Sequence, residues 1–382
     1  MSKSKKTYSQ QCPKFDLEKL AGTKHADGTI TPVPMSKIID ILKDQSKYVR
    51  FIKLRKKSGK IRRIVAPSPE YKTILRNLLL NFFKFYRPHE DAHGFVMYKS
   101  IVSNAKEHAG CYTQVHIDIK DFFDNITSRM VARALCGNKA LCSQCTDRYQ
   151  HASDKCQPNL SNRECNQMAY PDLDNINTGN INPSDPKTII FWITALCTFY
   201  DKRRNVRYTP QGFPTSPAIT NFVMGVYFDR MIKEYCELNK LTYSRYADDI
   251  SITSPDYLDK NKVSEIITYT YKMIASLRKD QSDKSNLQPN TAKTAVHRGK
   301  ARRKICGIVV NDNMSIQRTK VMKFRAELHN ILVGKGHTEK VKTKPSKARV
   351  HSIVGTANFY CMVNKKYEKY LEQAKRVQSL HG

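Results

Sequence analysis

Acidic residues are scarce in this sequence. It has 34 Asp and Glu against 66 Lys and Arg, which gives a formal net charge of +32. So large an excess of one sign makes a chain repel itself unless a polyanion neutralises it. Nucleic acid is the partner that this composition favours. An anionic membrane surface is the weaker alternative, because the sequence contains no clear amphipathic anchor helix.

Long apolar stretches are also missing. No segment approaches the roughly 20 apolar residues of a membrane-spanning helix, and the first ten residues, MSKSKKTYSQ, contain no apolar signal core. We therefore expect a cytoplasmic protein without a membrane partner, in which the 11 cysteines form no disulfide framework. With 382 residues, 40% of them hydrophobic, the chain is long enough for a sizeable core in two or three subdomains.

The periodicity of the sequence predicts its elements. Residues 51–67 read as two strands that form a hairpin rich in cations. The apolar spacing in residues 71–86 and 217–238 predicts helices, and residues 305–310 read as one short strand. Residues 138–187 are polar, rich in Asn and interrupted by Pro and Cys. We therefore expect an insertion or a long loop there.

Three carboxylates lie on predicted strands. Alternation in residues 113–119 puts Asp118 on the face opposite the core. In residues 241–253, LTYSRYADDISIT, Asp248 and Asp249 lie in a tight turn between two strands. Adjacent like charges repel, so the pair indicates either a solvated turn or a divalent cation that needs both. If the two segments are neighbours in a sheet, their oxygens suit Mg²⁺, and two such ions about 4 Å apart promote phosphoryl transfer.

The motifs of this sequence resemble those of reverse transcriptases. IDIKDFF, QGFPTSP and YADD follow one another in the order typical of that family, and LRKKSGKIRRIVAPSPE is similar to its fingers hairpin. SNAKEH, with Asn104 and His108, resembles the Asn-Ala-x-x-His signature of bacterial retron reverse transcriptases. The later Val-Thr-Gly motif of those enzymes is matched only in its glycine, Gly307. The resemblance extends from about residue 50 to residue 365.

The resemblance implies an α+β fold of the right-hand polymerase type, with fingers, a palm built on an antiparallel sheet, and a helical thumb. The implied parts are an N-terminal segment 1–50, fingers 51–112, a palm with fingers elements 113–314 that contains a Cys-rich insertion at about 136–187, and a basic thumb 315–382. The thumb segment holds fifteen Lys and Arg against four Asp and Glu.

The resemblance also implies an activity. Reverse transcriptases polymerise dNTPs on an RNA template by two-metal nucleotidyl transfer with Mg²⁺. Members of the retron type copy a structured non-coding RNA into RNA-linked multicopy single-stranded DNA (msDNA), and an effector or toxin protein is the expected partner in anti-phage defence. The alternatives are an intron-type or diversity-generating reverse transcriptase, and an RNA-binding scaffold that restrains a toxic effector.

Single residues take roles through the same resemblance. Asp118, Asp248 and Asp249 match the metal-binding carboxylates, and Lys293 resembles the general acid for pyrophosphate departure. Phe123 falls at the steric gate that excludes a 2′-OH, with a core side chain as the alternative. The implied nucleotide contacts are Arg62, Ile119, Gln211 and Gly212, and the implied RNA contacts are Asn104, His108, Lys320, Lys323 and Arg325.

The Cys-rich insertion contains a candidate zinc site. Cys142 and Cys145 have the C-x-x-C spacing of half a zinc site, whereas Cys156 and Cys165 are spaced more widely than the second half requires. A small polar segment without a core gains stability from a metal. The alternative is a loop with free thiols that docks an RNA element or a partner protein.

Overall fold

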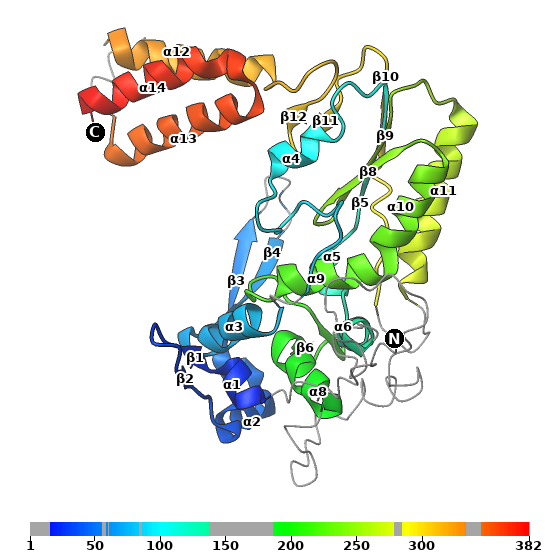
Figure 1. Cartoon of the computed structure of the whole chain (residues 1–382), viewed down its shortest axis with the longest axis vertical. Coiled ribbons are helices and arrows are strands. Elements are labelled where there is room, and N and C mark those ends of the chain that lie inside the picture. The colour runs from blue at the N-terminus through cyan, green and yellow to red at the C-terminus, as the bar shows by residue number, and fades with distance from the viewer. Residues whose placement is uncertain are drawn as a thin grey trace, which may run out of the picture. The chain divides into compact units, whose positions relative to one another are not determined.

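The computed structural model describes residues 16–55, 59, 61–83, 86–136, 186–278, 285–333 and 345–381. These residues, whose elements are labelled in Figure 1, belong to two compact units. Unit 1 comprises Met1–Ala92, Ile119–Glu234 and Thr268–Asn290, and unit 2 comprises His93–Asp118, Tyr235–Ile267 and Thr291–Gly382. No helix in the described part of the chain is long and apolar enough to cross a membrane.

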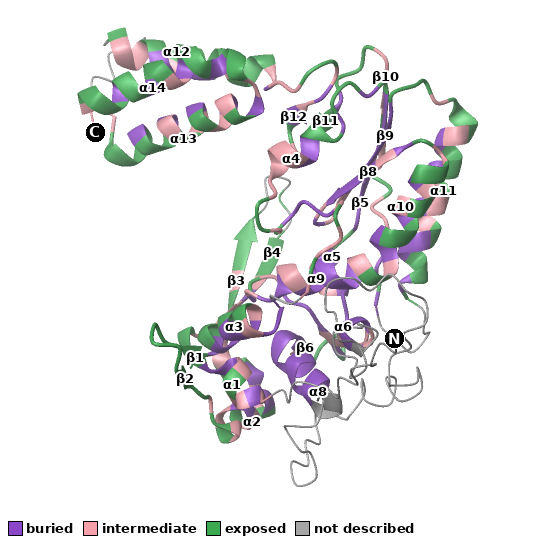
Figure 2. Ribbon diagram, in the orientation of Figure 1, coloured by how far each residue is buried: buried purple, intermediate pink, exposed green. Residues whose placement is uncertain are grey.

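Unit 1 is mainly helical, with short hairpins between the helices. Its elements are α1 (Leu17–Ala21), β1 (Thr23–Lys24), β2 (Ile30–Thr31), α2 (Met35–Lys43), η1 (Gln45–Tyr48), β3 (Val49–Arg55), β4 (Ile61–Pro67), α3 (Pro69–Asn81), α5 (Phe122–Asn125), α6 (Ser128–Cys136), α8 (Pro186–Cys197), β6 (Phe199–Asp201), β7 (Val206–Tyr208), α9 (Ser216–Met224) and the π-helical turn η6 (Gly225–Asp229). Residues 189–197 of the α8 helix are all buried (Figure 2).

The cationic hairpin predicted at 51–67 is confirmed. Strands β3 and β4 pair antiparallel with Val49 opposite Pro67 and Arg55 opposite Ile61. Because side chains alternate along a strand, the cations of the hairpin are divided between its two faces.

The helix predicted over 71–86 is shorter than its apolar pattern. α3 begins after Ser68, whose side chain accepts a hydrogen bond from the Tyr71 amide, and ends at Asn81. The pattern continues because Phe82 and Tyr86 pack their rings together, with centroids 5.2 Å apart, in the segment that follows. Aromatic packing here maintains an apolar period after the helix has stopped.

Unit 2 is built on a four-stranded antiparallel sheet in the order β10-β5-β9-β8. Its elements are α4 (Ile101–Lys106), β5 (Thr113–Asp118), β8 (Thr242–Tyr246), β9 (Asp249–Ser254), β10 (Ala295–Arg298), β11 (Lys304–Ile305), β12 (Ile308–Val309), α12 (Arg318–Val333), α13 (Lys347–Val363), η7 (Lys365–Tyr367) and α14 (Glu368–His381). The predicted antiparallel sheet and the predicted helical C-terminal region are both confirmed.

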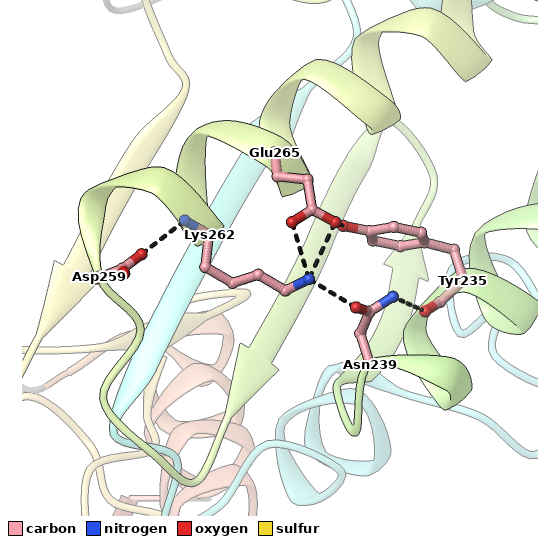
Figure 3. A network of polar contacts seen from close by, with 5 residues as sticks. All are labelled: Tyr235, Asn239, Asp259, Lys262 and Glu265. Carbon is pink, nitrogen blue, oxygen red and sulfur yellow. Dashed lines mark hydrogen bonds and ion pairs between the residues drawn. The ribbon is translucent and has the colours of Figure 1, made fainter.

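The helix predicted over 217–238 is formed by α9, η6 and α10 (Arg230–Leu238) in succession. The end of α10 is joined to the start of α11 (Lys260–Ser276) by polar contacts (Figure 3). Lys262 Nζ lies 2.6 Å from Asn239 Oδ1 and 2.9 Å from Glu265 Oε1, and Tyr235 Oη donates to Glu265 at 2.8 Å. These contacts hold the end of α10 against the start of α11. In the sequence, the two helices precede and follow the β8–β9 hairpin.

The single strand predicted over 305–310 is wrong, because the segment is a hairpin. β11 pairs with β12, and Cys306 and Gly307 form the turn with φ values of 48° and 85°. Two successive positive φ values are typical of two-residue hairpin turns, where Asn-Gly is the usual sequence. Because cysteine is not a usual residue at the first position of such a turn, the sequence does not indicate the turn.

The thumb helices share a core with the β11–β12 hairpin inside unit 2. Ile305 and Ile308 belong to the same buried cluster as Phe324 of α12 and Tyr360 of α13. The rings of Phe324 and Tyr360 lie edge to face with centroids 5.2 Å apart. The helices therefore fold against the β11–β12 hairpin rather than as an isolated bundle.

Candidate functional site

The sheet of unit 2 brings the three predicted carboxylates together. β5 lies beside β9 with Asp118 directly opposite Asp249, and Asp248 lies in the turn between β8 and β9. The two carboxylate-bearing segments are therefore neighbours in one sheet, which is the condition under which the sequence favours a Mg²⁺ site. Cross-strand partners have Cβ atoms about 5 Å apart, so the fold places like charges side by side.

The turn itself is held by a close backbone approach. Ala247 has a φ of 58°, in the left-handed region. A Cβ atom added to Gly94 would lie 2.6 Å from the Ala247 nitrogen, closer than any real side chain comes. Only glycine at position 94 lets the two backbones meet in this way.

Lys293 is the cation of the site. Its Nζ lies 2.9 Å from Asp118 Oδ2, and the side chain of Asp118 is 6% exposed whereas that of Lys293 is 61% exposed. The hydrogen bond to Asp118 raises the pKa of Lys293. Lys293 therefore lies at the carboxylates, as the sequence predicted, in its charged form.

Burial and mutual repulsion disfavour the charged forms of the turn carboxylates. Burial, and then the neighbouring Asp249, raise the pKa of Asp248 to about 6. Burial and the charge of Asp118 raise the pKa of Asp249. A bound cation would reduce the repulsion between these carboxylates and favour their charged forms.

His116 is a fourth titratable group of the site, and sequence reasoning gave it no role. Its Nε2 lies 3.8 Å from Asp249 Oδ1, and burial lowers its pKa. The signal that finds it is strand alternation, since His116 and Asp118 are two residues apart and share one face of β5.

The three carboxylates of this site offer oxygen ligands that fit Mg²⁺, although Asp118 is bonded to the ammonium group of Lys293. Within the described ranges, no three His, Cys, Asp or Glu side chains converge as a metal-binding set. Asp118 is instead bonded to Lys293. Carboxylate oxygens are the ligands that Mg²⁺ prefers, so Asp118, Asp248 and Asp249 are the residues that would hold it, in competition with Lys293.

Asn104 and His108, the predicted RNA contacts, are buried at 1% exposure each. His108 Nε2 lies 2.6 Å from Ser244 Oγ of β8, and its Nδ1 lies 2.7 Å from Thr253 Oγ1 of β9. Side chains so enclosed present no polar atom to RNA. We infer that His108 instead fixes the strand pair that carries Asp248.

Asn104 contacts the β11–β12 turn. Its Nδ2 lies 3.3 Å from the sulfur of Cys306. Burial raises the pKa of that thiol to about 11, and the nearby turn carboxylates add to the shift. The two halves of the retron-like signature, around Asn104 and around Gly307, are therefore in direct contact in the fold.

The other predicted nucleotide contacts lie in unit 1. The Val65 amide of β4 donates to the Gln211 carbonyl at 2.8 Å, and a Cβ on Gly212 would lie 2.5 Å from the Val65 carbonyl oxygen. The Gln-Gly motif thus lies against the strand that carries the exposed Arg62.

Phe123 and Ile119 differ in how open they are. Phe123 is half-buried, with its ring 5.5 Å from that of Phe122 and nearly edge to face. Ile119 is 1% exposed and forms a bridge to Pro289, so its side chain is a core group rather than a surface for a nucleotide. Asp121 and Asp124 lie at α5, where Asp121 makes no side-chain cap bond.

The predicted thumb cations are on the surface. Lys320, Lys323 and Arg325 are all exposed on α12. The candidate zinc ligands Cys142, Cys145, Cys156 and Cys165 lie outside the described residues, as does almost all of the predicted insertion.

Part of this chain is similar to known proteins. Residues 180–317 match the family model described as reverse transcriptase (RNA-dependent DNA polymerase). The retron Mx162 reverse transcriptase of Myxococcus xanthus is 27% identical over 73% of this chain and 52% of its own length. The retron Ec73 reverse transcriptase of Escherichia coli is 27% identical over 86% of this chain and 89% of its own length.

Among solved structures, the Sicinivirus 3Dpol RNA-dependent RNA polymerase aligns with 95% of this chain and 73% of its own, at 10% identity and a TM-score of 0.42. The matched part of this chain spans about half the length of the Myxococcus relative.

The family model, over residues 180–317, and the two retron relatives support the predicted resemblance to reverse transcriptases, and the described helices and antiparallel sheet agree with the predicted α+β class. Within that class, the predicted resemblance to bacterial retron reverse transcriptases is confirmed as well, by the Myxococcus and Escherichia relatives.

Proposed function

We propose that this protein is a retron-type reverse transcriptase that copies a structured non-coding RNA into msDNA. The observation that carries the proposal is the cross-strand pair of Asp118 and Asp249, with Asp248 in the adjoining turn. The net charge of +32 supports a polyanionic template and product.

The residues of the site divide the chemistry among them. Asp118, Asp248 and Asp249 would hold Mg²⁺, which supplies charge stabilisation for the transferring phosphoryl group when bound. Lys293, already charged beside Asp118, donates a proton from Nζ to the departing pyrophosphate. In unit 1, the exposed Arg62 binds the triphosphate through its planar guanidinium, and Phe123 excludes a 2′-OH.

Primer extension on an RNA template tests the polymerase. Asp248→Asn should abolish DNA synthesis, because the amide cannot bind the cation as a carboxylate does, while RNA binding stays intact. Asp256→Asn is the matched control, since Asp256 is exposed just beyond the end of β9. Synthesis by the Asp248→Asn protein within a few-fold of wild type would remove the carboxylates from the mechanism.

Sequencing the nucleic acid that co-purifies with the protein tests the retron type. One structured RNA covalently joined to single-stranded DNA is the expected result. An intron RNA, or a variable repeat that is copied elsewhere, would favour the other reverse transcriptases. A single RNA without attached DNA would favour an RNA-binding scaffold.

Two partners complete the proposal. An effector protein is expected to co-purify with the chain and its msDNA if the system acts in anti-phage defence. Zinc is proposed for Cys142, Cys145, Cys156 and Cys165, and elemental analysis of the purified protein measures it. A zinc content near zero after metal-replete expression would leave these thiols without a metal role.

A further inference from the structure

The turn that leads into α5 needs support from outside itself. α5 comprises only Phe122–Asn125, and helices shorter than about 12 residues are marginal on their own. The residue before it, Asp121, has φ and ψ values of 44° and 47°, in the left-handed region, and its side chain makes no cap hydrogen bond. A residue with a side chain adopts that conformation only at an energetic cost. Other contacts must therefore hold this turn in place.

The side chain of Asn125 supplies contacts of this kind. It is 6% exposed, and its Nδ2 donates to the Asp121 carbonyl at 3.0 Å and to the Lys120 carbonyl at 3.3 Å. These two carbonyls belong to the peptide groups before and after Asp121. Because a side-chain amide has two N–H donors, both donors of Asn125 are used within this one turn. Asn125 therefore fixes the backbone on each side of the left-handed residue.

The acceptors of Asn125 are bonded to segments distant in the sequence. Its Oδ1 accepts from the Asn286 amide at 3.3 Å and from Arg204 Nη2 at 3.4 Å. Its main-chain carbonyl accepts from Ser285 Oγ at 2.7 Å. All of these residues belong to unit 1. The short helix is thus attached to the rest of its unit through one residue rather than stabilised by its own length.

Phe123 lies on the other side of the same helical turn. Positions two apart differ by roughly 200° around a helix, so a helix anchored at Asn125 directs Phe123 away from the anchor. Phe123 is half-buried, whereas Asn125 and Phe122 are buried. The Phe123 ring lies 5.5 Å from that of Phe122. Its position therefore depends on the turn that Asn125 holds.

We propose that Asn125 is a positioning residue for sugar selection, which holds Phe123 where the ring excludes a 2′-OH. The inference rests on the proposed function, in which Phe123 is the steric gate, and it adds a buried residue that acts only through that gate. Selectivity is a difference between two transition states, and a displacement of about 1 Å in a contacting group is enough to change it. A residue that only stabilised the fold would leave the selectivity unchanged.

Single-nucleotide incorporation by the full chain on an RNA template measures the ratio of kcat/KM for dNTP over that for NTP. Asn125→Asp keeps the size of the side chain but sets an acceptor against the two carbonyls, so we expect the ratio to fall about threefold or more. Asn77→Asp is the matched control in unit 1, because Asn77 is also buried and its Nδ2 donates to the Ala21 carbonyl at 2.9 Å. It should lower Tm as Asn125→Asp does and leave the ratio unchanged.

A double variant separates positioning from a general loss of stability. If Asn125 acts through Phe123, the protein with both Asn125→Asp and Phe123→Ala should have the ratio of Phe123→Ala alone, because the two effects are then not additive. Ser285→Ala is a milder change that removes the hydrogen bond to the Asn125 carbonyl. It should lower the ratio in the same direction, and it tests the inference even if Asn125→Asp does not fold.

The inference is overturned if Phe123→Ala lowers the ratio while the folded variants at Asn125 and Ser285 do not. It is also overturned if Asn77→Asp lowers the ratio equally, or if the effects of Asn125→Asp and Phe123→Ala are additive in the double variant. Each of these outcomes leaves Phe123 as the gate. An unchanged ratio in Phe123→Ala would instead remove the gate itself and this inference with it, so the two failures are distinguishable.

Discussion

At the scale of single residues, the fold holds three carboxylates close together although their negative charges repel one another. Asp248 is half-buried beside Asp249, and the pair faces Asp118 across the strands. The repulsion persists beside Lys293, whose side-chain hydrogen bond within the described residues is to Asp118. The carboxylates therefore cost stability until a cation binds.

The pH dependence of stability follows from the pKa of Asp248. Its value of about 6 in the fold exceeds the ordinary value of 3.8. The contribution of this group to stability is therefore fully present below about pH 4 and is lost as the pH rises through 6. Without metal, Asp248→Asn should raise the free energy of unfolding by about 3 kcal/mol at pH 7.5 and leave it unchanged at pH 4.

Urea unfolding in EDTA at the two pH values measures this difference, with Asp256→Asn as the control. Equal stability of wild type and Asp248→Asn at pH 7.5 would contradict the electrostatic account.

Sugar selection is a prediction for Phe123. Removing its half-buried ring should admit ribonucleotides, because the group that collides with the 2′-OH is gone. We expect Phe123→Ala to lower the ratio of kcat/KM for dNTP over that for NTP by about tenfold or more. Phe359→Ala on α13 is the control. An unchanged ratio in an active Phe123→Ala protein would return Phe123 to the core.

At the scale of elements, β8 and β9 act as one support for the turn that carries Asp248. His108 connects both strands to the end of α4 by two hydrogen bonds. Burial lowers the pKa of His108 to about 3, so the ring is neutral at physiological pH. A neutral ring has one donor and one acceptor, which matches two hydroxyl partners.

Loss of this ring should loosen the strand pair. His108→Ala leaves the hydroxyls of Ser244 and Thr253 buried without a partner, which we expect to cost about 3 kcal/mol of unfolding free energy. Primer extension should fall as well, whereas RNA affinity should change little. His351→Ala, at an exposed position of α13, is the control. A selective loss of RNA affinity without loss of stability would restore the RNA contact for His108.

Helix α12 is the element that we expect to meet the RNA backbone. Replacing Lys320, Lys323 and Arg325 together by Ala should weaken binding of the cognate RNA, because duplex RNA is recognised largely through its backbone and shape. The slope of log K against log salt should become shallower by about 2, since fewer counterions are released.

The matched control removes three exposed cations of α11 and the residues just after it, Lys260, Lys272 and Arg278. A wild-type slope in the α12 variant would show that these cations do not meet phosphates.

At the scale of the whole molecule, the charge of +32 sets the behaviour of the chain without its nucleic acid. Self-repulsion destabilises the folded state, and salt screens it. Nucleic-acid-free protein should therefore gain about 2–5 °C in Tm between 50 and 300 mM NaCl. Calorimetry in one buffer measures this gain, and a Tm that is flat or falls with salt would show that the cations are already neutralised within the fold.

How far the sequence predicts the molecule depends on which kind of signal each part carries. Strand alternation predicted β5 and the β8–β9 hairpin, because apolar and polar side chains alternate along each strand even though both faces are largely buried. The same signal is silent about His108, since a histidine near a motif suits a ligand contact and a buried bridge equally. It also missed the β11–β12 hairpin, because no residue type announces a positive φ at Cys306.

Gly94 has a consequence for how this sequence can drift over generations. Any substitution there introduces a Cβ atom 2.6 Å from the backbone of the Ala247 turn, so every codon change that alters the residue displaces the turn that carries Asp248. The adjacent Met97 and Tyr98, whose side chains are 77% and 99% exposed, have no such constraint from packing. Neutral substitutions can therefore accumulate at Met97 and Tyr98, a few positions from a glycine that tolerates none. A lineage that loses Gly94 must first rebuild a turn about 150 residues further along the chain.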